Sequence, residues 1–229
     1  MTKSEYDFDL AVDLTQELAN GMPIYPGDPA PSFRRVSTIR ANGVNLSRLE
    51  LGSHTGTHVD APIHFVEGGT PVDRIAVSEF IGEALVLDLS FKPRGSGITS
   101  ADFEKALSTA GELSRGDMLI AYTGCSDLWG DPKVNSNYTY LDPDGAEYLV
   151  SKKIRAFGID FLSVEKFGSN THAAHKALLS SGIFIVESLS SKVKDFLGRR
   201  ILFVCLPIKF EGGDGAPCRA IAVPLIGRS

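Results

Sequence analysis

Five histidines are the residues of this 229-residue chain whose placement most clearly suggests chemistry. Three of them, His54, His58 and His64, lie close together, and Asp60 lies among them. Imidazole nitrogens with a carboxylate form a ligand set for zinc, manganese or iron that leaves room for water. Histidine beside aspartate also supports acid/base catalysis. Residues 54–64 are therefore predicted to hold a metal ion, to transfer protons, or to do both.

The spacing of these residues places a condition on the backbone. All four occupy even positions, so an extended strand would present them on one face. His54 and His64 would then lie about 33 Å apart, at about 3.3 Å per residue. Since a metal–nitrogen bond is about 2.1 Å long, shared coordination requires a tightly curved segment. Gly56 and Pro62 are the expected bending points.

A second candidate group lies in the C-terminal half of the chain. His172 and His175 are three residues apart on a predicted helix and would share one of its faces. Glu187 ends the apolar run of residues 183–186, where a buried carboxylate is costly unless it is paired or binds a metal. Glu187 is therefore a candidate ligand. For His172 the sequence leaves three roles open: ligand, support for a ligand, or helix surface.

Helices and strands must position these residues. Strands alternate with helices only in the second half of the chain, whereas the first half is predicted to be strand and loop. We expect strands at residues 10–14, 33–39, 46–51, 83–89, 117–122, 154–159, 183–187, 201–208 and 218–224. We expect helices at 99–109 with a capping box, at 143–152 after the N-cap Asp142, from Asn170 or Thr171 to 179, and at 190–196. This order predicts a mixed α/β fold rather than a regularly alternating, doubly wound one. No glycine-rich nucleotide-binding motif is present.

Composition excludes several classes of function. Hydrophobic residues make up 43% of the chain, charged residues 22%, and the formal net charge is -5, which predicts a soluble domain with no nucleic-acid or membrane partner. Three widely spaced cysteines predict neither a disulfide framework nor a metal site. The N-terminus has no apolar stretch typical of a signal peptide, so we expect a cytoplasmic protein. One domain over residues 1–229 is expected, with an arm and loop at about residues 1–32.

The segment HTGTHVDAPIHF, residues 54–65, resembles the HxGTHxDxPxHF signature of the cyclase family, which contains bacterial kynurenine formamidase and isatin hydrolase. The resemblance covers nearly the whole chain. It continues through shorter elements at 25–28 (YPGD), 123–124 (TG), 158–163 (GIDFLS), 175–189, 206–209 (LPIK) and 214–220 (DGAPCRA). The sequence departs from the family pattern at Cys125 and at Val164-Glu165, where substrate contacts are expected.

The resemblance implies a swivelling β/β/α domain and a metal-dependent hydrolase. His54, His58 and Asp60 would bind one metal ion, while His175 and Glu187 would complete that site or hold a second ion bridged by Asp60. His64 would be the general acid/base. The cofactor would be Zn²⁺ or Mn²⁺, with one or two ions per subunit. The resemblance also implies a homo-oligomer, here a homodimer or homotetramer, often with an N-terminal arm crossing to a neighbour.

The expected reaction is cleavage of a carbon–nitrogen amide bond by metal-activated water, with an N-formyl aromatic amine such as N-formylkynurenine as substrate (an arylformamidase). One alternative is a hydrolase that opens a cyclic amide such as isatin. A further alternative is a metal-binding protein without hydrolytic turnover. Tyr25 and Trp129 are the candidate substrate contacts, because planar substrates favour aromatic walls.

Overall fold

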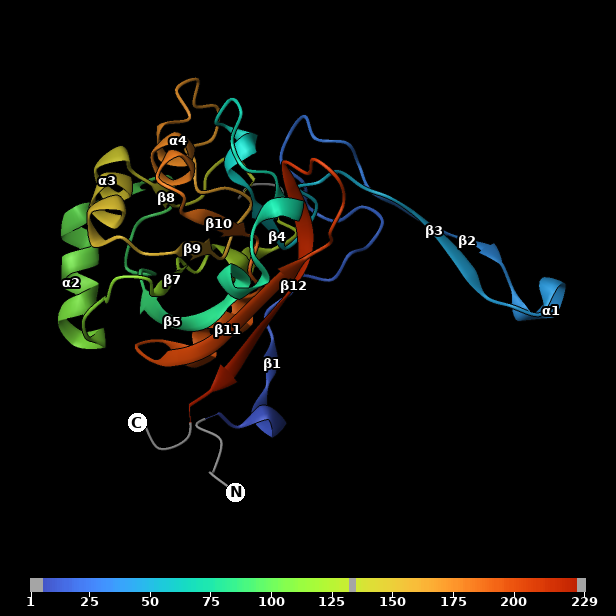
Figure 1. Ribbon diagram of the computed structural model, residues 1–229, viewed down its shortest axis with the longest axis horizontal. Coiled ribbons are helices and arrows are strands. Elements are labelled where there is room, and N and C mark those ends of the chain that lie inside the picture. The colour runs from blue at the N-terminus through green and yellow to red at the C-terminus, as the bar shows by residue number, and fades with distance from the viewer. Residues whose placement is uncertain (1–5, 132–134, 226–229) are drawn as a thin grey trace.

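The computed structural model describes residues 6–131 and 135–225 and contains one large mixed sheet. Its strand order is β1-β12-β11-β5-β7-β9-β10-β4. The strands are β1 (Val12–Asp13), β4 (His58–Asp60), β5 (Ile81–Asp88), β7 (Met118–Tyr122), β9 (Ala156–Ile159), β10 (Phe184–Glu187), β11 (Arg200–Pro207) and β12 (Gly215–Pro224). Figure 1 shows this sheet between helices on one side and a projecting hairpin on the other.

The sheet closes on itself at its shortest interior strand. β4 pairs antiparallel with β10 and also with β12, so the strands from β12 round to β4 form a ring. β5, β7, β9 and β10 run parallel to one another, as strands do when helices connect them. The register of β4 places His58 opposite Glu187 on β10 and opposite Pro217 on β12. Closure therefore brings two candidate ligands from distant parts of the sequence side by side.

Successive side chains along each strand point to opposite faces of the sheet, which divides the core into an inner and an outer layer. On β5, Ala84 and Val86 pack inside the ring, whereas Leu85 and Leu87 face the helices. The outer layer is covered by α2 (Ser100–Ala110), α3 (Pro143–Lys152) and α4 (Ala173–Ser180), which lie along the parallel strands in Figure 1. Both faces of the parallel strands are buried, which explains why these strands read as continuous apolar runs.

The remaining elements are short. β2 (Ser32–Ser37) and β3 (Leu46–Glu50) pair as a hairpin with α1 (Ile39–Asn42) at its tip, and β6 (Gly97–Ile98) pairs with β8 (Tyr140–Leu141). 3-10 helices span Phe8–Leu10, Pro62–His64, Val72–Arg74, Val77–Phe80, Cys125–Leu128 and Ser191–Phe196. The hairpin extends away from the body (Figure 1), and it begins where the expected N-terminal arm ends. In the described part of the chain, no helix is long and apolar enough to cross a membrane.

The mixed α/β class and most expected elements are confirmed. The capping box at Thr99 and Asp102 is present, and α3 occupies the predicted residues 143–152. The short helix expected at 190–196 is present as a 3-10 helix. The expected start of α4 was wrong: α4 begins after His172, which is its N-cap with a left-handed φ of 50°, rather than after Asn170 or Thr171. His172 therefore precedes the helix and does not share a helical face with His175.

Candidate metal centre

The candidate ligands converge at one end of the ring from five separate elements. His58 and Asp60 lie on β4, His54 lies in the turn before it, and His64 lies in the 3-10 helix after it; His175 comes from α4 and Glu187 from the end of β10. Together with neighbouring side chains, most of them line a pocket of about 210 Å³. The two groups predicted from separate parts of the sequence thus form one site.

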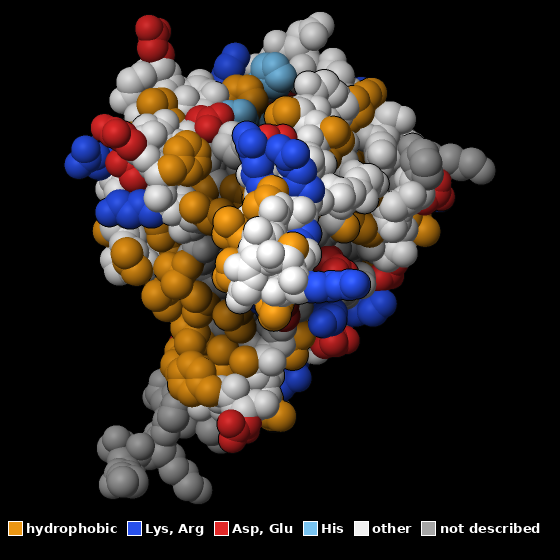
Figure 2. Space-filling view, turned by 90° about the vertical axis from the view of Figure 1, so that its right-hand side faces the viewer, with side chains coloured by type: hydrophobic (Ala, Val, Ile, Leu, Met, Phe, Trp, Pro, Cys, Tyr) orange, Lys and Arg blue, Asp and Glu red, His pale blue; other side chains and the backbone are white. Residues whose placement is uncertain are grey.

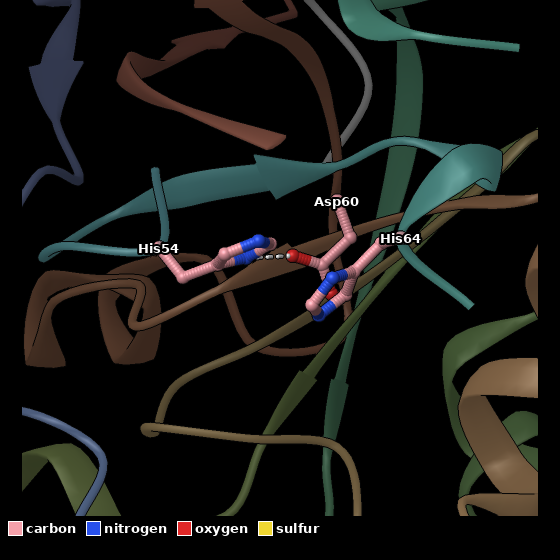
Figure 3. Close-up of side chains that lie close together, drawn as sticks. All are labelled: His54, Asp60 and His64. Carbon is pink, nitrogen blue, oxygen red and sulfur yellow. Dashed lines mark hydrogen bonds and ion pairs between the residues drawn. The ribbon is translucent and has the colours of Figure 1, made fainter. Parts of the chain in front are cut away.

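The curvature required between His54 and His64 occurs at the two predicted bends. Gly56 has a φ of 66°, and a Cβ at this position would lie 2.6 Å from Leu18 Cδ2, so glycine is needed here for conformation and space. Pro62 begins the 3-10 helix that turns the chain back. The His54 and His64 rings consequently stack, with centroids 3.9 Å apart, and both lie beside the Asp60 carboxylate (Figure 3).

Three histidines each direct one ring nitrogen at the central carboxylates, His54 at Asp60 alone and His58 and His175 at both Asp60 and Glu187. His54 Nδ1 lies 2.8 Å from Asp60 Oδ1. His58 Nε2 lies 3.2 Å from Asp60 Oδ1 and 3.5 Å from Glu187 Oε2. His175 Nε2 lies 3.6 Å from Asp60 Oδ2 and 3.3 Å from Glu187 Oε1. Imidazole nitrogens and carboxylate oxygens therefore face a common centre.

The other nitrogen of each ring is held by an acceptor outside this centre. His58 Nδ1 lies 2.8 Å from the Gly56 carbonyl oxygen. His175 Nδ1 lies 3.1 Å from Glu165 Oε2, and His54 Nε2 lies 3.1 Å from Asp214 Oδ2. When these outer nitrogens donate, each ring keeps a lone pair on its inner nitrogen. Metal-binding histidines are oriented in this way.

Two buried polar atoms in the centre have no hydrogen-bond partner. They are His58 Nε2 and Asp60 Oδ2, which belong to almost fully buried side chains. Candidate ligand atoms of His58, Asp60 and Glu187 lie within 4.8 Å of one another, as do those of His54, Asp60 and His64. Unsatisfied buried polar atoms are costly, and a coordinated cation would satisfy both. The residues therefore fit a divalent cation, and Asp60 belongs to both groups.

The electrostatics of the site favour positive charge at its centre. Burial alone would lower the pKa of both His54 and His58, but Asp60 outweighs it for His54, as the adjacent carboxylates of Asp60 and Glu187 do for His58. Their pKa values rise to about 9 and about 10. His64 behaves differently: burial, with His54 and His175 nearby, lowers its pKa to about 4. The negative potential that attracts protons to His54 and His58 would equally attract a divalent cation.

The remaining predicted residues are divided between the pocket and its surroundings. Tyr25 lines the pocket, whereas Trp129 is not among its lining residues and packs against Phe161 with ring centroids 6.1 Å apart. His172 lines the pocket, and its ring lies 4.9 Å from that of Phe65. Its position is therefore beside His175 at the pocket wall.

Two carboxylates that contact the histidines were not identified as functional from the sequence. Asp214 precedes β12 and is 160 residues from His54, and Glu165 is ten residues from His175 in the loop after β9. Asp214 was noted only as part of the 214–220 motif, and Glu165 only as a departure from the family pattern where substrate contacts are expected. No local spacing pattern links either of them to its histidine, so only the fold reveals these contacts.

Comparisons with known proteins agree with this geometry. Residues 12–166 match the family described as "Putative cyclase". A kynurenine formamidase of Geobacillus thermodenitrificans is 34% identical over 212 residues, covering 91% of this chain and 95% of the relative. A kynurenine formamidase of Erythrobacter litoralis is 33% identical, with 91% of each chain covered.

Solved structures are similar over almost the whole length. A potential metal-dependent hydrolase with cyclase activity is 31% identical, with a TM-score of 0.77 and coverage of 93% of this chain and 96% of that one. An isatin hydrolase bound to the product analogue thioisatinate has a TM-score of 0.87 at 24% identity, covers 94% and 92%, and shows the same fold. With its family match, its near-complete relatives and a convergent His/Asp/Glu centre, this chain belongs to the cyclase family.

Proposed function

We propose that this chain is a metal-dependent hydrolase of carbon–nitrogen amide bonds, with an N-formyl aromatic amine as its substrate. The observation that carries the proposal is the arrangement of His54, His58 and His175. Each ring is held at one nitrogen and directs the other at Asp60, and those of His58 and His175 also face Glu187. Relatives named kynurenine formamidase, which match nearly the whole chain, support the substrate class.

The proposed ligands are His54, His58, Asp60, His175 and Glu187. A divalent cation held there would polarise a carbonyl and lower the pKa of water toward 7, which is the chemistry that amide hydrolysis requires. Imidazole and carboxylate ligands accept Zn²⁺ and Mn²⁺ alike, and either one or two ions are compatible with the shared position of Asp60.

We assign the proton transfers to His64. Its lowered pKa keeps the imidazole neutral at neutral pH, so the ring is able to accept a proton from the attacking water and return it to the leaving nitrogen. His64 Nδ1 lies 3.8 Å from Asp214 Oδ2, near enough for the carboxylate to stabilise the protonated ring. The stacked His54 ring fixes the plane of the His64 imidazole.

The test compares the full chain with two variants, after metal removal and reloading with Zn²⁺ or Mn²⁺. The wild-type protein is expected to hydrolyse formanilide and N-formylkynurenine only when loaded. His58→Ala should lose metal and activity together. His64→Ala should keep its metal and lose about 10²–10⁴-fold in turnover. Loss of metal from His64→Ala would instead make His64 a ligand, a role its position beside Asp60 also permits.

Two outcomes would favour the alternative functions. Turnover of isatin without turnover of the formanilides would identify a cyclic-amide hydrolase. Full metal occupancy with no turnover of any amide or lactam would identify a metal-binding protein without hydrolytic activity.

We also propose a single-domain protein that forms a homodimer or homotetramer through the β2–β3 hairpin. Its side chains are largely exposed, including the large hydrophobic residues Val36, Ile39, Val44, Leu46 and Leu49. An isolated hairpin is marginally stable in water, so a neighbouring subunit would stabilise it. Figure 2 shows further hydrophobic side chains on the face from which the hairpin projects.

Light scattering of the wild-type chain and of a Val36→Glu/Leu46→Glu variant tests this assignment. A monomeric wild-type protein would contradict it.

A cytoplasmic location is proposed as well, because all three cysteines, Cys125, Cys205 and Cys218, are free and buried.

A further inference from the structure

Three carboxyl side chains line the pocket beside the metal centre, and one of them lacks a partner. Glu187 accepts a hydrogen bond of 2.6 Å from the Val164 amide and faces His58 and His175. Glu165 accepts hydrogen bonds from the amide and the ring of His175. Asp28 makes no side-chain hydrogen bond or ion pair with any residue that the structure describes. The pocket therefore contains one carboxylate that no directly bonded protein group neutralises.

The position of Asp28 is fixed by a tight turn. Pro26 and Gly27 occupy the two central positions of this turn, and the Asp28 amide donates to the Tyr25 carbonyl over 3.0 Å. Gly27 has a φ of 107°, a conformation that favours glycine, and proline is well suited to the position before it. The turn thus holds its two ends, Tyr25 and Asp28, at the pocket wall.

The surroundings of Asp28 combine apolar surface with negative charge. Tyr25 packs against Phe167 with ring centroids 5.9 Å apart, and Ile24 and Leu162 also line the pocket. Burial raises the pKa of Asp28; His54 and His58 act in the opposite direction, and Glu187 and Asp60 reinforce the rise. A single divalent cation at the centre would be balanced by Asp60 and Glu187, which leaves the charge of Asp28 available to a ligand.

We propose that Asp28 is a specificity-determining residue that pairs with a cationic amine of the substrate. The pocket would then select aromatic amides whose ring or acyl substituent carries a protonated amine, in preference to neutral amides of the same size. Charge-assisted hydrogen bonds from an ammonium group to a carboxylate are among the strong interactions available to a partly buried site. This inference rests on the proposed hydrolase function and adds the chemical class of its substrate.

The test uses two formanilides that differ in one group. One carries a 3-aminomethyl substituent, which is protonated at neutral pH, and the other carries a 3-hydroxymethyl substituent. For the metal-loaded full chain, Asp28→Asn should lower kcat/KM for the amine by about 10–100-fold, the loss expected for a hydrogen bond to a charged group. The loss should lie mainly in KM. The hydroxymethyl compound should change by less than about 3-fold, which is within the range of a weak neutral contact.

Glu17→Gln is the matched control, because it removes one negative charge from an exposed position in the same N-terminal segment and does not line the pocket. Its two kcat/KM values should equal those of the wild-type protein. The inference is overturned if Asp28→Asn lowers both substrates equally, changes neither, or loses its metal.

A failure of the hydrolase function would be recognised separately. If the wild-type protein cleaves neither formanilide, the same two compounds serve as binding probes in isothermal titration calorimetry. Binding of the ammonium compound about 10-fold more tightly to the wild-type protein than to Asp28→Asn would support the pairing with Asp28. Equal affinity would overturn it.

Discussion

Asp60, at the end of β4, and Asp160, directly after β9, are two fully buried carboxylates of the same sheet, and their surroundings differ in kind. Asp160 follows β9 and accepts five hydrogen bonds, from the amides of Thr123, Gly124 and Ser126 and from the hydroxyls of Thr123 and Ser126. Asp60 faces only histidine rings, and its Oδ2 has no hydrogen bond.

The pKa values of the two carboxyl groups are shifted in opposite directions. Burial raises the pKa of Asp160 in spite of its hydrogen bonds. For Asp60 the same burial is outweighed by His54 and by the nearby rings of His175 and His58, which hold its pKa well below the usual range. Burial alone therefore does not distinguish a functional carboxylate from a structural one. The distinction lies in whether the chain supplies enough hydrogen-bond donors to satisfy it.

Replacing Asp60 should give the largest effect. Asp60→Asn removes the charge shared by both candidate ligand groups while keeping the side-chain volume, so we expect loss of bound metal and at least about 10³-fold lower activity. Metal analysis and amide hydrolysis after reloading measure this effect. Retained metal at wild-type stoichiometry would remove the basis for treating Asp60 as a ligand.

Replacing Asp160 should affect stability instead of metal binding. Asp160→Asn turns an amide NH₂ group toward backbone and hydroxyl donors, which should cost roughly 3 kcal/mol in the free energy of unfolding. At this chain length each kcal/mol lowers Tm by about 2–4 °C. Folded Asp160→Asn should still bind metal at the wild-type ratio. The comparison fails if this variant loses metal while its Tm is unchanged.

Replacing Glu165 tests whether the hydrogen-bond acceptors outside the metal centre contribute to metal affinity. Glu165→Ala removes the partner of His175 Nδ1 and should weaken metal affinity by roughly 10–100-fold, measured by calorimetry or chelator competition. Glu165→Gln keeps an acceptor oxygen and should lose less. Equal affinities for all three proteins would show that the orientation of His175 does not depend on Glu165.

Replacing Asp102 should have a smaller effect on stability. This carboxylate lies near the surface and accepts hydrogen bonds from neighbouring donors. It accepts from Lys92 Nζ and from the amide and hydroxyl of Thr99 at the start of α2. Although burial acts in the opposite direction, the bonds to Lys92 and Thr99 lower its pKa below 3.8. The stabilising contribution is therefore complete above the unfolded-state value near 3.8 and is lost as pH falls through the lower folded-state value.

Asp102→Asn should cost about 1 kcal/mol at pH 7, as expected for a capping interaction. Denaturant unfolding at pH 7 and at pH 2.5 measures the change: the difference between variant and wild-type protein should shrink at the lower pH. A difference that grows at low pH would contradict the assignment.

Local patterns in the sequence predicted much of the fold and part of the site. Apolar runs identified β5, β7, β9, β10 and β11, and the Asp142-Pro143 pair marked the start of α3, because these signals act within a few residues. The start of α4 was misplaced because His172 adopts a left-handed conformation, which is uncommon for residues other than glycine. The short β4 was expected only as a curved segment, since its pairing depends on β10 and β12.

By itself the sequence determined which residue types were available for chemistry and where the chain bends between His54 and His64. Gly56 and Pro62 impose those bends locally, through a positive φ and a fixed ring. Only the tertiary structure decided which groups meet. Closure of the sheet sets Glu187 beside His58, and it brings Asp214 to His54 across 160 residues. Such contacts depend on strand register and long-range pairing, which short sequence patterns do not specify.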